Sequence, residues 1–98
     1  MPTDHRQQAH ASIEALIATL RSQPSDDALT PLVSECESLA RAIAAFHMEG
    51  IRFRMYNVDR LLQRPGLPLP IEVATLFSQA RRELEAAGFH TRSHQAPG

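Results

Sequence analysis

Metal binding is the first chemistry that the residue types of this chain suggest, because it holds five histidines, one cysteine and several glutamates. His10 and Glu14 lie four residues apart, as do His90 and His94, and this spacing places two ligands on one face of a helix. No histidine stands three residues after a glutamate, so the Glu-x-x-His pair of carboxylate-bridged di-iron bundles is absent. We interpret both pairs as solvated side chains and expect neither a metal site nor a cofactor.

One histidine falls on a row of mostly apolar side chains whose gaps of three and four residues predict a single buried helix face. The row consists of Val33, Cys36, Ala40, Ile43, His47, Ile51, Met55, Val58 and Leu62. A buried His47 could titrate near neutral pH and act as a switch or a metal ligand. Its ring nitrogens could instead be satisfied by a polar neighbour at a helix interface. A metal-binding helical bundle centred on His47 is therefore an alternative function.

Nucleophilic catalysis would need a base within hydrogen-bond reach of the nucleophile. Cys36 lies on the apolar row, and burial makes a thiol unreactive. His47 stands 11 residues farther along the same predicted helix, a distance of about 16 Å. The sequence holds no glycine-rich phosphate loop, nucleophile elbow or zinc motif. We therefore expect no catalytic residues and predict that the chain is not an enzyme.

Arginines alternate with aromatic residues between positions 52 and 60. The predicted partner-binding residues are Arg52, Phe53, Arg54, Tyr56 and Arg60. Such a surface suits the helix or acidic segment of a partner protein, with the aromatic rings as anchors and the arginines as orienting groups. The same arginines together with Arg64, interleaved with Phe53 and Tyr56, could instead bind phosphates and stack on bases. The formal net charge of -1 favours the protein partner, and a nucleic-acid-binding regulator is the second alternative.

Prolines and apolar spacing predict three helices, at about residues 5–22, 30–64 and 70–87. Asp4 resembles an N-cap, Thr30 with Pro31 suits the start of the second helix, and Gly88 suits the residue after the third. The predicted fold class is all-α. We expect one helical domain over residues 1–98, with loose termini at 1–4 and 90–98.

Residues 51–56 are ambiguous, because apolar and charged side chains alternate from Ile51 to Met55 as in a half-buried strand. The helical spacing of Ile51, Met55, Val58 and Leu62 favours a helix instead.

The long central helix, 30–64, would position all of these residues. Its 35 residues would span roughly 52 Å, whereas a compact chain of this length has a diameter of roughly 33 Å. The helix must either bend at Gly50 or complete its core with a second copy. We predict the second arrangement, in which the first and third helices lie along the two halves of the central helix. These elongated antiparallel hairpins would be completed by dimerisation into a helical bundle.

Charge distribution supports an antiparallel homodimer. Residues 1–49 carry three arginines and seven acids, a balance of -4, whereas residues 50–98 carry seven arginines and four acids, a balance of +3. Opposite halves of two chains would therefore attract each other. The predicted dimer-interface residues are Leu39, Ile43, Phe46, His47 and Phe53.

Other features of the sequence bear on location. No apolar run approaches the roughly 20 residues of a membrane span, and the start lacks the pattern of a signal peptide. A single cysteine excludes an internal disulfide framework. We expect a soluble, cytoplasmic interaction or regulatory protein that binds itself and an unidentified protein partner, but no membrane.

Overall fold

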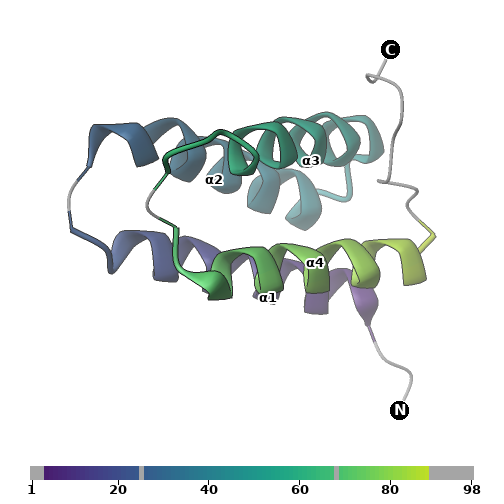
Figure 1. Ribbon diagram of the computed structural model, residues 1–98. Coiled ribbons are helices and arrows are strands. Elements are labelled where there is room, and N and C mark those ends of the chain that lie inside the picture. The colour runs from purple at the N-terminus through teal and green to yellow at the C-terminus, as the bar shows by residue number, and fades with distance from the viewer. Residues whose placement is uncertain (1–3, 25, 68, 89–98) are drawn as a thin grey trace.

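Four helices form two layers in the computed structural model, which describes residues 4–24, 26–67 and 69–88 (Figure 1). They are α1 (His5–Arg21), α2 (Thr30–Ala44), α3 (Met48–Leu62) and α4 (Ile71–Ala86), and a short 3-10 helix, η1 (Asp27–Leu29), precedes α2. The hairpin of α2 and α3 forms one layer, and α1 with α4 forms the other. The described residues contain no strand, so the predicted all-α class is confirmed.

The first and last predicted helices are confirmed nearly to the residue. The Asp4 carboxylate accepts a hydrogen bond of 3.1 Å from the backbone N–H of Gln7 and caps α1. Gly88 follows α4 with a φ of 97°, a left-handed conformation that glycine adopts without steric cost. Of the termini that we predicted to be loose, residues 1–3 and 90–98 lie outside the described part of the chain.

The predicted continuous helix over residues 30–64 is wrong, because the chain reverses its direction between α2 and α3. The backbone N–H of Phe46 donates to the carbonyl of Ile43 at 3.1 Å, and that of His47 donates to Ala42 at 3.0 Å. This pair of bonds is typical of a Schellman ending. Phe46 takes the left-handed φ of 58° that such an ending requires, at a position where glycine is usual. The count of three helices is therefore corrected to four.

His47 begins α3 as its N-cap. Its ring nitrogen Nδ1 accepts a hydrogen bond of 2.8 Å from the backbone N–H of Gly50. A Cβ atom at position 50 would lie 2.7 Å from this nitrogen, so the close approach requires glycine. His47 is exposed, and the prediction that it lies on a buried helix face is wrong. Residues 51–56 lie within α3, which confirms the helical interpretation of that segment.

Arg6 on α1 stabilises the same chain reversal. Its Nη1 donates to the carbonyls of Ile43 at 3.2 Å and Ala44 at 3.3 Å, in the last turn of α2. The guanidinium also lies 5.4 Å from the centroid of the Phe46 ring. A cation is favourable at the negative end of a helix and satisfies carbonyls that have no partner within it.

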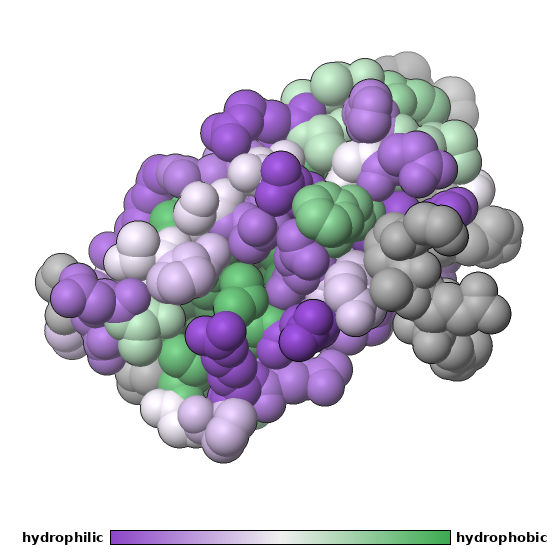
Figure 2. Space-filling model, turned by 90° about the horizontal axis from the view of Figure 1, so that it is seen from above, coloured by the Kyte–Doolittle hydropathy of each residue, from purple (hydrophilic) through white to green (hydrophobic). Residues whose placement is uncertain are grey.

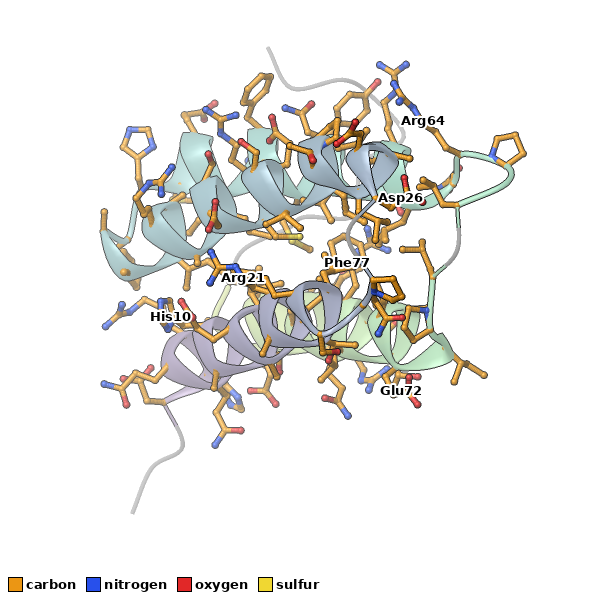
Figure 3. All side chains as sticks on the ribbon, turned by 90° about the vertical axis from the view of Figure 1, so that its left-hand side faces the viewer. His10, Arg21, Asp26, Arg64, Glu72 and Phe77 are labelled. Atoms are coloured by element: carbon orange, nitrogen blue, oxygen red, sulfur yellow. The ribbon has the colours of Figure 1, made fainter. Side chains whose placement is uncertain are left out.

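The apolar faces of all four helices meet in one core between the layers. Its largest fully buried side chains are Ile13, Leu16, Leu32, Leu39, Ile43, Ile51, Met55, Leu84, Val58, Val73 and Cys36. Phe77 points from α4 into this core and is only 4% exposed (Figure 3). The radius of gyration of the Cα atoms, 12.8 Å, is that of a single globular chain of this length. One chain therefore closes its own core.

This arrangement removes the reason for which we predicted an elongated dimer. Leu39 and Ile43, two of the predicted interface residues, are fully buried within the chain and cannot contact a second copy. The last helix, α4, packs mainly against α1 rather than along α3. His5 at the start of α1 approaches Glu83 near the end of α4 at 2.7 Å, as expected for antiparallel neighbours.

We expect His47→Ala to lower the free energy of unfolding by about 1 kcal/mol, because α3 loses the acceptor that caps its first turn. His47→Asn should retain most of the stability, since asparagine is a good N-cap. Urea denaturation followed by circular dichroism would measure both. His10→Ala is the matched control, because His10 makes only a half-exposed pair with Glu14 at 3.5 Å. An unchanged urea midpoint for His47→Ala would contradict the capping role.

Candidate partner-binding surface

The outer face of α3 carries most of the predicted partner-binding residues. Phe53, Tyr56 and Arg60 follow one another with gaps of three and four residues, so they lie along one side of the helix. The side opposite to them contributes Ile51, Met55 and Val58 to the core. Burial of that inner row therefore fixes the outer row in solvent, where the Phe53 side chain is 46% exposed.

Two arginine–aromatic pairs lie next to each other on this face. The Arg54 guanidinium carbon lies 5.2 Å from the centroid of the Phe53 ring, and that of Arg60 lies 5.8 Å from the centroid of the Tyr56 ring. A guanidinium over an aromatic face is attracted by the ring quadrupole.

Arg54 is engaged within the hairpin, on its inner edge. Its Nη1 donates to both carboxylate oxygens of Glu35 on α2, at 3.1 Å each. The amide nitrogen of Asn57 lies 3.4 Å from the same carboxylate. These contacts join α3 to α2, so Arg54 orients Phe53 and neutralises Glu35. The exposed pair of Arg52 with Glu49, at 4.0 Å, is weaker.

A cleft of about 390 Å³ lies where α2 begins and α3 ends. It is lined by Pro31, Glu35, Asn57, Arg60, Leu61 and Arg64. Among the described residues, no carboxylate forms an ion pair with Arg60 or Arg64. Arg64 extends from the α2/α3 layer into solvent (Figure 3). Arg64 was not among the predicted partner-binding residues, although the nucleic-acid alternative included it; it follows the last turn of α3, so its position depends on the loop.

The remaining predicted interface residues are exposed. Phe46 is 57% exposed at the chain reversal, and His47 caps α3 beside it. Seen from above, the α2/α3 layer is mostly hydrophilic, and its hydrophobic areas are separated by polar surface (Figure 2). Phe53 is therefore a local anchor on a polar surface, whereas Phe46 lies beside the exposed apolar residues Ala45 and Met48 at the chain reversal. This layer has no wide apolar face like that of an obligate dimer.

The candidate metal pairs gain no further ligand. Within residues 4–24, 26–67 and 69–88, no group of three or more His, Cys, Asp or Glu side chains is placed to hold a metal ion. His10 and Glu14 form a pair on α1, and His90 and His94 lie outside the described residues. An ion pair between Arg21, at the end of α1, and Glu37 joins α1 to α2.

Cys36 is fully buried on α2. Burial, and to a lesser degree the neighbouring Glu35 carboxylate, raise the pKa of its thiol from 9.0 to about 12. The thiol is therefore neutral at physiological pH, and nothing in its surroundings activates it as a nucleophile.

Comparisons of this chain with protein-family models, curated proteins and solved structures found no match. In the described part of the chain, no helix is both long enough and apolar enough to cross a bilayer. The function must therefore be argued from the surface of the molecule alone.

The Cys36 pKa predicts a pH-dependent loss of stability. The folded chain keeps this proton between pH 9.0 and about 12, whereas the unfolded chain releases it. Because the folded state then binds more protons, the free energy of unfolding should fall as pH rises through this range. The free energy of unfolding of Cys36→Ala, measured by urea denaturation from pH 8 to about 11, should fall less steeply. Equal slopes for the two proteins would contradict a buried, protonated thiol.

Proposed function

We propose that this protein is a small helical interaction protein of the regulatory type, which binds an acidic segment of a partner protein across the outer face of α3. One observation carries the proposal. Two arginine–aromatic pairs lie side by side on an exposed helix face, next to a cleft with two arginines that no carboxylate of the described residues neutralises.

Anchor residues at protein interfaces are enriched in tyrosine and arginine, and an exposed aromatic ring gains most when a partner covers it. Phe53 and Tyr56 supply these rings. The Arg54 guanidinium, which Glu35 holds, already contacts the Phe53 ring before a partner arrives, so this pair loses less side-chain freedom on binding. Arg60 adds hydrogen-bond donors in the fork geometry that matches a carboxylate.

A protein partner fits this surface better than a nucleic acid does. Nucleic-acid affinity comes mainly from many neighbouring cations that contact successive phosphates. The acids Glu49 and Asp59 lie beside or among the arginines of α3, and Glu35 on α2 pairs with Arg54. This mixture of charges, in a chain of net charge -1, suits a short acidic segment with an apolar anchor.

Two other functions have less support. The metal-binding alternative centred on His47 is weakened because Nδ1 of that ring already accepts the hydrogen bond that caps α3. Homodimerisation stays a proposal that rests on Phe46, His47 and Phe53, since Leu39 and Ile43 are buried. Sedimentation equilibrium at micromolar concentration would test the dimer.

The partner-binding proposal predicts that Phe53→Ala combined with Tyr56→Ala weakens partner binding about 30-fold or more, since lost anchors of this kind cost about 2 kcal/mol or more. The measurement is affinity capture followed by titration of the captured protein. Ile71→Ala is the matched control, because Ile71 is 80% exposed on α4, in the other layer. Circular dichroism would verify that every variant folds.

A photoreactive benzoylphenylalanine at position 53 should crosslink to the same partner, and one at position 71 should not. Unchanged affinity of the double variant would contradict the proposal. So would a captured nucleic acid whose binding falls steeply with added salt.

A further inference from the structure

We propose that the cleft between the start of α2 and the end of α3 is a carboxylate-binding site, in which Arg60 and Arg64 hold a glutamate side chain of the partner's acidic segment. This inference rests on the proposed function, but it can be tested without the partner. It names the chemical group that the surface recognises and the part of the surface that recognises it.

The charges around the cleft leave an excess of positive charge. Glu35, the acid that lines it, accepts two hydrogen bonds from Arg54 at 3.1 Å and lies 3.4 Å from the Asn57 amide. Asp59 precedes Arg60 in the chain but pairs with Arg81 on α4 at 3.7 Å. Both acids therefore already have a cationic partner, and the guanidiniums of Arg60 and Arg64 are left to attract an anion from solution.

The geometry of the cleft suits a single carboxylate. Arg60 is held on one side by its contact with the Tyr56 ring, whereas Arg64 comes from the loop that follows α3. Two guanidiniums that approach from different segments can each donate to one carboxylate oxygen. The start of α2 at Pro31 adds the positive end of a helix to the same place.

The apolar walls favour glutamate over a bare anion. Pro31 and Leu61 line the cleft beside the two arginines. The methylene groups of a glutamate side chain can contact these walls while its carboxylate reaches the guanidiniums. Apolar walls with a few polar groups are typical of ligand-binding sites. Inorganic phosphate would make only the charged contacts.

The position of the cleft also predicts the spacing of the partner's residues. Arg60 lies seven residues after Phe53 on α3, which is about 10 Å along the helix axis. A partner helix that lies along α3 would therefore carry its glutamate about two turns from the apolar side chain that covers Phe53.

A nuclear magnetic resonance titration with the acetylated, amidated tripeptide Glu-Glu-Glu would test the site. We expect saturable shifts of the Arg60 and Arg64 Nε–H signals and of the backbone amides lining the cleft. The matching tripeptide Gln-Gln-Gln should produce none, since it lacks carboxylates. Arg60→Gln combined with Arg64→Gln should raise the dissociation constant about tenfold or more, because charge-assisted hydrogen bonds are lost.

Arg82→Gln is the matched control for this titration, because Arg82 is exposed on α4 and should leave the affinity unchanged. Arg60 and Arg64 are both exposed, so their substitution should leave the circular dichroism spectrum unchanged. The site would be overturned if the double variant bound the tripeptide as tightly as the unchanged protein does. It would also be overturned if Arg82→Gln lost as much affinity as the double variant. An oligonucleotide, inorganic phosphate or anionic vesicles that bind the cleft more tightly than the tripeptide would overturn it as well.

The failure of this inference is distinguishable from failure of the proposed function. If the tripeptide does not bind but the Phe53 and Tyr56 double variant still loses the partner, the cleft assignment is wrong and the aromatic surface stands. If the tripeptide binds and that variant keeps the partner, the cleft assignment stands and the aromatic surface is wrong.

Discussion

The rest of the structure depends on the reversal of the chain between α2 and α3. It is held by the left-handed backbone of Phe46, by the ring of His47 as a helix cap, and by the guanidinium of Arg6 on the last carbonyls of α2. Without it, residues 30–62 would form a rod too long for a single globule. With it, both halves of the rod turn their apolar faces into one core, and α1 with α4 covers that core from the other side.

The same reversal creates the candidate site. It brings Arg54 on α3 to Glu35 on α2, two residues that are distant along the chain. The resulting ion pair neutralises the acid beside the cleft and leaves Arg60 and Arg64 without an acidic partner among the described residues. Burial of Met55 and Val58 directs Phe53, Tyr56 and Arg60 outwards. The fold and the surface that we propose to bind a partner are thus consequences of one hairpin.

Much of this fold could be predicted from the sequence. Periodicity identified the buried rows of α1 and α4, and capping residues gave their ends within about two residues. The apolar periodicity could not predict the break near Phe46. No glycine or proline marks the break, and the apolar spacing continues from Ile43 to Ile51 across the turn. The comparison of helix length with globule diameter did indicate a bend. We chose the wrong alternative because Gly50, four residues after Phe46, was the only visible helix breaker.

Only part of the site could be predicted. The residues on the α3 face follow from the spacing within one helix, whereas the cleft forms only when α2, α3 and the following loop pack against one another. The most direct test of the hairpin is the distance between nitroxide labels at Ser34→Cys and Arg60→Cys in a Cys36→Ala background, measured by pulsed electron paramagnetic resonance. Dilution with unlabelled protein removes distances between chains. A continuous helix would place these positions roughly 39 Å apart. The hairpin predicts a far shorter distance, and a value near that of the continuous helix would contradict it.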